Sequence, residues 1–264
     1  MNKNLQIAIK ASLAAGKEIM EVYDTAFAVD FKDDNSPLTE ADKKANNIIN
    51  SYLVPSKIPI ISEENKQTDF SIRKHWETCW IVDPLDGTKE FVKRNGEFTV
   101  NIALVTQGKP VLGVIYVPVT QTLYYSDIEN SKSFKASLTS HDVSLERVQQ
   151  VAKAIHPKIT DNKLVKIVGS RSHMNPDTLD FIEKLKFAGK DIEIVSKGSS
   201  LKFCIIAEGE ADIYPRFAPT MEWDTAAGQA ICEAVGINVI SVDMEQKLVY
   251  NKENLLNSSF LVSK

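Results

Sequence analysis

The chain begins with a hydrophobic pattern that predicts two amphipathic helices joined by a loop. Apolar side chains recur at helical spacing over residues 5–23, with charged side chains between them. Residues 32–37 are polar and end in proline, which predicts a loop. Thr39 then begins a second helix, where Asp42 three residues later is typical of a capping box and Pro55 marks the end.

The periodicity of the remaining chain changes twice. Short runs of β-branched and aromatic residues between Gly- and Pro-containing turns predict an antiparallel meander, with strands at 58–61, 78–82, 98–105, 111–117 and 122–125. After the polar, weakly patterned residues 130–161, strands alternate with helices: the strands are 165–168, 192–195, 211–214 and 236–240, and the helices are 176–187, 199–208 and 223–235.

This order of elements predicts an α+β chain whose strand-rich and alternating halves are layered against each other. The 264 residues are enough for one domain. We expect a single domain over residues 1–264 with two lobes, at about 1–130 and about 131–264.

Composition is that of an ordinary globular protein, with 43% apolar and 25% charged residues. The net charge of −4 argues against a broad nucleic-acid surface. No run approaches the ~20 apolar residues of a membrane span, and the N-terminus lacks the pattern of a signal peptide, so the cytoplasm is the expected compartment. The three scattered cysteines are expected to be buried free thiols: Cys79, Cys204 and Cys232.

The segment with the clearest chemistry is WIVDPLDGT, residues 80–88. An apolar strand runs into Asp83 and Asp86, which flank a predicted bend, so both carboxylates and the carbonyl of Leu85 can converge on one point. Two carboxylates so close repel each other, and one is neutral at pH 7 unless a cation intervenes. Oxygen ligands of this kind suit Mg²⁺, which completes its shell with water and substrate phosphate.

Further acidic residues stand at the end of a strand or the start of a helix. Glu63 and Glu64 follow an apolar run, and Asp224 opens the last predicted helix. Each acidic residue alone has a structural explanation, as a turn residue, a helix cap or a solvated loop residue. Together with Asp83 and Asp86 they favour a metal site. The i, i+3 spacing of that pair argues against a haloacid-dehalogenase-type phosphatase, whose two aspartates stand at i and i+2.

Two segments, DPLDGT at 83–88 and WDTAAG at 223–228, resemble the paired signatures of the inositol monophosphatase superfamily. Further stretches resemble its bacterial 3′(2′),5′-bisphosphate nucleotidase branch, of the CysQ type; they lie at residues 34–42, 85–101, 169–173 and 198–204. The resemblance covers nearly the whole chain. It implies a layered αβαβα sandwich, Mg²⁺-dependent hydrolysis of 3′-phosphoadenosine 5′-phosphate to AMP and phosphate, inhibition by Li⁺ and a place in sulfur metabolism.

The resemblance also implies roles for individual residues. Thr88, paired with Asp42, would orient and deprotonate the attacking water, while Asp42 can cap its helix at the same time. Glu63 would take part in catalysis as well. Two or three Mg²⁺ ions would be bound by Glu63, Asp83, the carbonyl of Leu85, Asp86 and Asp224. The substrate phosphate would contact four of these ligands, Glu63, Leu85, Asp86 and Asp224, and the backbone N–H groups of Gly87 and Thr88.

The nucleotide and its second phosphate would be held by residues of the second half, namely Ser170, His173, Gly198, Lys202 and Arg216. Read alone, His173 would be a solvated loop histidine and Lys202 a solvated helix residue. Each residue of this set follows a predicted strand, where the loops of an αβ site gather, and this placement favours ligand contacts.

Three functions remain open at this point. The nucleotidase, acting on a small nucleotide bisphosphate, is favoured by the KEF continuation at residues 89–91 and by residues 198–202. An inositol monophosphatase or a sugar bisphosphatase of the same superfamily is the alternative enzyme. A phosphometabolite sensor could keep the carboxylates, but it has no need to keep Thr88 together with Asp42. The resemblance allows a homodimer and peripheral association with the inner membrane.

Overall fold

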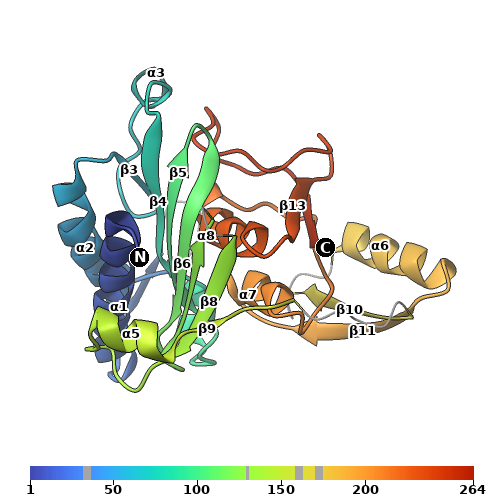
Figure 1. The fold of residues 1–264 in the computed structure, drawn as a ribbon, viewed down its shortest axis with the longest axis horizontal. Helices are drawn as coiled ribbons and strands as arrows, with labels where there is room; N and C mark the ends of the chain where they lie inside the picture. The colour runs from blue at the N-terminus through green and yellow to red at the C-terminus, as the bar shows by residue number, and fades with distance from the viewer. Residues whose placement is uncertain (32–36, 129–130, 158–162, 170–174) are drawn as a thin grey trace.

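Five alternating layers of helix and sheet make up the protein (Figure 1). The computed structural model describes residues 1–31, 37–128, 131–157, 163–169 and 175–264. The α-helices are α1 Lys3–Tyr23, α2 Glu40–Leu53, α3 Phe70–Arg73, α4 Thr88–Val92, α5 Leu145–Val151, α6 Pro176–Phe187, α7 Leu201–Ala207 and α8 Glu222–Glu233, and one 3₁₀ turn, η1, covers Val54–Ser56.

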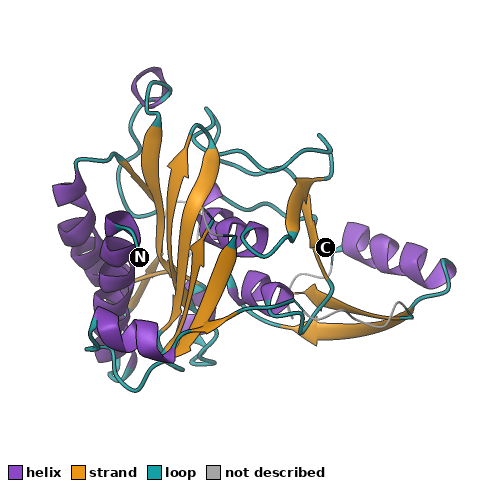
Figure 2. Ribbon diagram, viewed as in Figure 1, coloured by secondary structure: helices purple, strands orange, loops and turns teal. Residues whose placement is uncertain are grey.

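The strands fall into two large sheets and one hairpin, coloured orange in Figure 2. The hairpin pairs β1 Val29–Phe31 with β2 Pro37–Thr39. The first sheet contains β3 Ile60–Ser62, β4 Thr78–Asp86, β5 Thr99–Thr106, β6 Lys109–Val117, β7 Thr122–Asp127, β8 Lys132–Ser137 and β9 Lys153–Ala154. The second sheet contains β10 Leu164–Gly169, β11 Asp191–Ser196, β12 Ile213–Arg216, β13 Asn238–Ser241 and β14 Phe260–Ser263.

The layers run from α1 and α2, through the seven-stranded sheet, to α7 and α8, then the five-stranded sheet and finally α6 (Figure 1). The predicted αβαβα sandwich is therefore confirmed. Within the part of the chain that the structure describes, no helix is long and apolar enough to cross a bilayer.

The first sheet is the predicted meander, extended beyond β7, and its first pair of strands is parallel where the prediction was antiparallel. Its strands lie in the order β3 to β9; β3 and β4 are parallel, and the other neighbours are antiparallel. Pairing continues beyond residue 130 through β8 to β9, so residues 132–137 and 153–154 belong to this sheet. The sequence pattern missed β8 because four of its six residues are polar, namely Lys132, Ser133, Lys135 and Ser137.

The second sheet has the order β11-β10-β12-β14-β13. β10 is parallel to β11 and to β12, as the predicted alternation of strand and helix requires. β14, which the sequence pattern missed, inserts between β12 and β13 and is antiparallel to both. No short turn connects β14 to either of its partners, so the local sequence gives no sign of this pairing.

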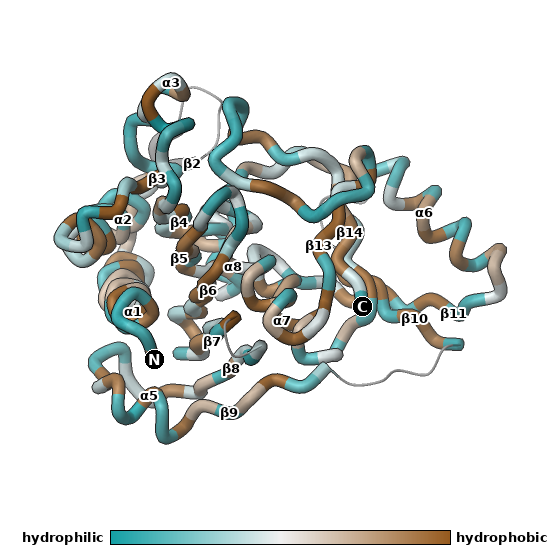
Figure 3. Tube along the Cα trace, turned by 45° about the horizontal axis from the view of Figure 1, so that its top comes forward, coloured by the Kyte–Doolittle hydropathy of each residue, from teal (hydrophilic) through white to brown (hydrophobic). Residues whose placement is uncertain are grey.

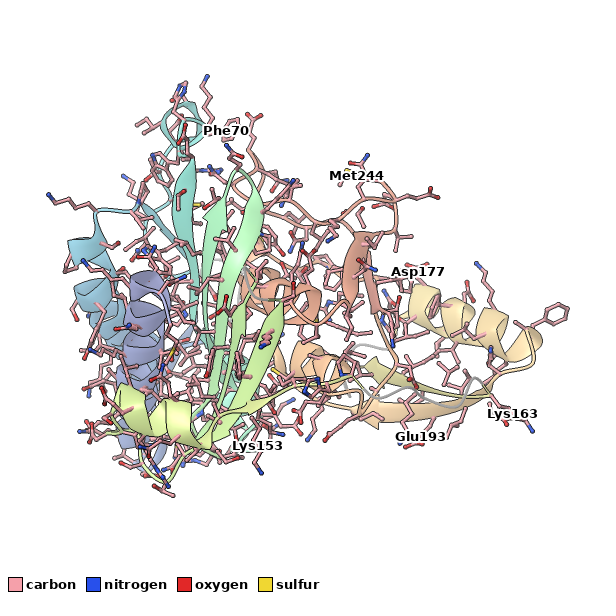
Figure 4. All side chains as sticks on the ribbon, in the orientation of Figure 1. Phe70, Lys153, Lys163, Asp177, Glu193 and Met244 are labelled. Atoms are coloured by element: carbon pink, nitrogen blue, oxygen red, sulfur yellow. The ribbon has the colours of Figure 1, made fainter. Side chains whose placement is uncertain are left out.

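Two apolar clusters fill the space between the layers, where brown segments face each other in Figure 3. One lies between the first sheet and α1 and α2, and the other lies between the two sheets, around α7 and α8. Strand β4 contributes to both, because Trp80 and Val82 face the first cluster and Cys79 and Ile81 face the second. All three cysteines are buried and free, as predicted. Side chains such as Met244, Glu193 and Lys163 lie at the periphery (Figure 4).

Helix α8 packs directly against the first sheet, and a glycine makes this close contact possible. A Cβ atom on Gly113 of β6 would stand 2.4 Å from the carbonyl oxygen of Ala227. On its other side α8 meets α7, where a Cβ on Gly228 would stand 2.3 Å from the ring of Phe203. These contacts fix the position of α8, and with it the position of the acidic residues at its N-terminus.

We predict that Gly113→Ala destabilises the protein by about 2 kcal/mol or more, because the added methyl group meets a helix backbone that cannot move aside. Gly189→Ala is the control, because it adds the same methyl group at a position with no neighbour within 4 Å. Its φ of +81° is unfavourable for alanine, so we expect only this local backbone cost, of about 1 kcal/mol. Urea unfolding of both variants measures the difference. Equal losses would contradict the tight fit of α8.

Candidate active site

Three carboxylates from two distant parts of the chain meet between the first sheet and α8. Asp83 and Asp86 lie at the end of β4, where the pairing with β5 shifts register between them. The strand therefore continues through both residues, in place of the predicted bend, and the turn begins at Gly87 with a φ of +91°. Asp224 comes from the first turn of α8. One oxygen of each carboxylate lies within 4.8 Å of the others.

The folding of β4 and α8 explains why these groups meet. Side chains alternate across a strand, so Asp83 points to the same side as Cys79 and Ile81, toward α8. Asp224 reaches back from the third position of its helix, and its Oδ2 accepts a hydrogen bond from the N–H of Met221 at 2.7 Å. Asp224 is therefore not the N-cap residue that its sequence position alone suggested, because Met221 holds that position; Asp224 contacts the start of the helix from its first turn and also belongs to the carboxylate cluster.

The cluster is strongly unfavourable as a set of charges. Asp83 is 1% exposed, and burial, followed by repulsion from Glu63, Asp86 and Asp224, raises its pKa well above the ordinary value. Desolvation and then Asp86 also raise the pKa of Asp224. Within the described part of the chain, no lysine or arginine forms an ion pair with Asp83, Asp86 or Asp224. A hard, divalent cation with oxygen ligands fits such a donor set.

All the predicted metal ligands line one cavity of about 360 Å³: Glu63, Asp83, Leu85, Asp86 and Asp224. The predicted residues Gly87 and Thr88 line it as well. Glu63 stands outside the group of three whose oxygens lie within 4.8 Å of one another, and its backbone N–H donates to the carbonyl of Val82 on the neighbouring strand at 3.1 Å.

The predicted pair of Thr88 and Asp42 is in contact. The Thr88 hydroxyl donates to Asp42 Oδ1 at 3.2 Å and lies 3.4 Å from the carbonyl oxygen of Leu85. The other oxygen, Asp42 Oδ2, accepts from the N–H and the hydroxyl of Thr39, both at 2.7 Å. Asp42 therefore caps α2 with one oxygen and fixes Thr88 with the other, so the structural and the site contact occur together.

A second cavity, of about 130 Å³, adjoins the first and is lined by Gly198, Lys202 and Arg216 together with Asp86 and Asp224. The side chains of Lys202 and Arg216 make this second cavity suitable for an anion. Lys202 is 7% exposed rather than solvated, and burial lowers the pKa of its ammonium group to about 8. Arg216 Nε is buried and has no hydrogen-bond partner among the described residues, and such an orphaned donor is costly without a ligand.

Three of the five residues predicted for the nucleotide thus line one cavity. The other two, Ser170 and His173, lie outside the described residues. Sequence reasoning missed three polar side chains that contact Asp86, namely Asn101, Ser199 and Ser200, and it also missed Thr99, which contacts Asn101 and Ser199. Thr99 and Asn101 did leave a signal, since they are polar residues at alternate positions of an otherwise apolar strand.

Comparison with known proteins agrees with this geometry. A model of the inositol monophosphatase family matches residues 1–263. The chain belongs to this family. It is 43% identical over 253 residues to 3′(2′),5′-bisphosphate nucleotidase CysQ of Salmonella typhimurium, which covers 94% of this chain and 95% of that protein. The protein of the same description from Buchnera aphidicola is 44% identical over 89% of this chain and 83% of its own.

A solved structure gives the same picture. The crystal structure of CysQ from Bacteroides thetaiotaomicron, described as a bacterial member of the inositol monophosphatase family, superposes with a TM-score of 0.87. It is 48% identical and covers 98% of this chain and 96% of that one.

We predict that saturating Mg²⁺ raises the melting temperature more at pH 8 than at pH 6. The raised carboxyl pKa values mean that the folded, metal-free protein binds more protons than the unfolded chain, so its stability falls as pH rises from the ordinary carboxyl pKa through the raised values. A cation competes with those protons and stabilises the folded state most where they are lost.

Thermal unfolding at both pH values, with EDTA and with Mg²⁺, measures this difference. Asp83→Asn is the control, because it removes a ligand together with the carboxyl group whose pKa is most affected, and the pH-dependent gain should shrink. A Mg²⁺ effect of the same size at both pH values would contradict the charge state assigned to the cluster.

Proposed function

We propose that this chain is a Mg²⁺-dependent 3′(2′),5′-bisphosphate nucleotidase, which hydrolyses the 3′-phosphate of 3′-phosphoadenosine 5′-phosphate to give AMP and phosphate. One observation carries the proposal: an acidic cavity that suits a metal-bound phosphate adjoins a cavity with Lys202 and Arg216 that suits a second anion. A substrate with two phosphates on one small scaffold would occupy both. The relatives named above, which bear this activity in their description, support it.

The proposed metal ligands are Glu63, Asp83, the carbonyl of Leu85, Asp86 and Asp224, holding two or three Mg²⁺ ions. Bound there, Mg²⁺ would neutralise charge on the phosphoryl group and lower the pKa of a coordinated water. The buried carboxylates would hold the metal ions in place, since a protein catalyses phosphoryl transfer mainly by positioning the reacting groups and by electrostatic stabilisation.

Thr88 is the proposed residue that orients the attacking water. Its hydroxyl hydrogen is directed to Asp42 Oδ1, so its oxygen lone pairs are available to accept a hydrogen bond from water. As the water oxygen attacks phosphorus and the ester P–O bond breaks, Thr88 would take a proton from the water while its own hydroxyl proton passes to Asp42 Oδ1. The leaving 3′ oxygen would take a proton from solvent to become the hydroxyl of AMP. Gly87 and Thr88 would offer backbone N–H groups to the phosphate, and Gly87 fits this turn because a Cβ there would stand 3.2 Å from the carbonyl oxygen of Glu97.

The side chains proposed for the nucleotide are Lys202 and Arg216, beside Gly198. Lys202 Nζ donates to the carbonyl of Ser199 at 2.7 Å, which directs the ammonium group along the cavity, and its remaining hydrogens can donate to a phosphate. The unpartnered Arg216 Nε is a further donor for the same ligand. A sensor that only bound the nucleotide would not need the Thr88–Asp42 contact, which favours an enzyme.

Phosphate release from a substrate panel tests the proposal. We expect adenosine 3′,5′-bisphosphate to have a kcat/KM at least about tenfold above that of inositol 1-phosphate, whose single phosphate can fill only one of the two cavities. Fructose 1,6-bisphosphate carries two phosphates but no nucleoside, so it tests the nucleotide part of the proposal, and we expect it to be the poorer substrate as well. EDTA should abolish the activity, Mg²⁺ should restore it and Ca²⁺ should replace it poorly, owing to its larger and looser shell. Preference for a sugar phosphate, or full activity in EDTA, would overturn the proposal.

The roles of Thr88 and Asp86 can be separated by mutation. Thr88→Ala should lower kcat with little change in Mg²⁺ affinity, because Thr88 acts on the water. Asp86→Asn removes a metal charge and should reduce kcat/KM by about 100-fold with a parallel loss of Mg²⁺ affinity. Steady-state kinetics across a Mg²⁺ titration distinguishes the two effects. If Thr88→Ala mainly weakened Mg²⁺ binding, the proposed division of roles would be wrong.

A further inference from the structure

Ser199 occupies a position between the two cavities and contacts the main charged group of each. Its hydroxyl donates to Asp86 Oδ2 at 2.6 Å, and its carbonyl oxygen accepts from Lys202 Nζ at 2.7 Å. Asp86, at the end of β4, lines both cavities and is a proposed metal ligand, whereas Lys202 belongs to α7 and lines the second cavity. One residue thus joins the carboxylate of one site to the ammonium group of the other.

The carboxylate of Asp86 only accepts, so the hydroxyl proton of Ser199 goes to Asp86. The hydroxyl of Thr99 donates to Asn101 Oδ1 at 2.9 Å and lies 2.7 Å from the hydroxyl of Ser199, so it packs against Ser199. Ser200 adds its N–H and its hydroxyl, both 2.7 Å from the same Asp86 oxygen, and its hydroxyl in turn accepts from Asn101 Nδ2 at 2.7 Å.

This network leaves one oxygen of Asp86 for a cation. In the described ranges of the chain, every hydrogen bond to the carboxylate goes to Oδ2, and Oδ1 receives none. Three short bonds to one oxygen hold the carboxylate plane in one orientation, as the outer contacts of a metal ligand do.

The backbone at Ser199 is held in a conformation that is costly for a side chain. Its φ is +52°, in the left-handed region that non-glycine residues rarely adopt. The loop is fastened on both sides of it: the N–H of Gly198 donates to Glu97 Oε2 at 2.9 Å, and Ser200 is bound to Asp86. A strained residue persists only where its surroundings over-determine it, and such residues gather at functional sites.

We propose that Ser199 is a positioning residue that couples the two cavities: its hydroxyl orients Asp86 for the metal ion, and its carbonyl holds Lys202 for the phosphate that is not hydrolysed. The identity of that second ligand rests on the proposed nucleotidase function. Cation binding at Asp86 and anion binding at Lys202 both require the same strained loop, so occupation of either cavity orders the loop for the other.

Ser199→Gly tests the coupling, because glycine adopts the positive φ freely and only the hydroxyl is lost. We expect the affinity for Mg²⁺, measured by calorimetry without nucleotide, to fall about tenfold, in the range of a lost hydrogen bond to a charged group. The affinity for adenosine 3′,5′-bisphosphate in EDTA should fall as well, by about threefold or more, as the Lys202 partner loosens. Gln107→Gly is the matched control, since Gln107 has a φ of +50° in an exposed turn and should change neither affinity.

In Lys202→Met, the direction of the change in Mg²⁺ affinity distinguishes the coupling from a simple effect of charge. Removal of a positive charge beside three carboxylates would by itself tighten Mg²⁺ binding. Coupling through Ser199 predicts the opposite, about a threefold weaker Mg²⁺ affinity, because the Ser199 carbonyl loses its partner and the loop relaxes. The double variant Ser199→Gly, Lys202→Met should bind Mg²⁺ no more weakly than Ser199→Gly alone, since the two changes break one connection.

The Mg²⁺ measurements need no nucleotide, so they decide the role of Ser199 even if the substrate panel favours another phosphomonoester and the proposed function fails. Should Ser199→Gly not fold, Thr99→Val removes the buried hydroxyl that contacts both Ser199 and Asn101 and should weaken Mg²⁺ binding in the same direction, by less. Weaker Mg²⁺ binding in Ser199→Gly or Thr99→Val, together with weaker binding in Lys202→Met, supports the coupling. Unchanged Mg²⁺ affinity in the Ser199 variant, or tighter Mg²⁺ binding in Lys202→Met, overturns it.

Discussion

Repulsion among buried carboxylates is the constraint on which the rest of the site depends. Asp83, Asp86 and Asp224 lie close together at the junction of a sheet and a helix, and burial raises the pKa of Asp83 and Asp224. Such an arrangement costs free energy that the apolar layers must supply. The close approach of α8 to the first sheet at Gly113 is one place where packing holds the charges together against that repulsion. A divalent cation bound among the carboxylates would remove most of this repulsion, so the folded protein already holds the ligands of a cation in place.

The acidic residues of the site also form hydrogen bonds that stabilise the local backbone. These hydrogen bonds hold the carboxylates of the cluster in fixed orientations. Asp42 and Asp224 both stand at the third position of a helix and accept a hydrogen bond from the backbone N–H three residues earlier. Asp86 binds the loop of Ser199 and Ser200 with one oxygen. In each case one oxygen of the carboxylate is fixed by the fold, so loss of the residue removes a structural contact together with the chemistry.

Most of this site could be predicted from the sequence, because its residues follow strand ends and open helices in recognisable motifs. The predicted metal residues line one cavity, and Thr88 contacts Asp42. The support of Asp86 could not be predicted, since Ser199 is brought to it by tertiary packing across more than a hundred residues. For the same reason the pairing of β14 with β12 and β13 could not be predicted, because the hydrophobic pattern of a strand does not show which distant strands it pairs with.

Anomalous scattering from crystals soaked in Mn²⁺ tests the central claim most directly, because Mn²⁺ takes the same hard oxygen ligands as Mg²⁺. The account predicts an anomalous peak bounded by the carboxylates of Asp83, Asp86 and Asp224, with Asp86 bound through Oδ1 and its Oδ2 still held by Ser199 and Ser200. Crystals that show no peak among these carboxylates, or a peak only elsewhere in the molecule, would contradict it.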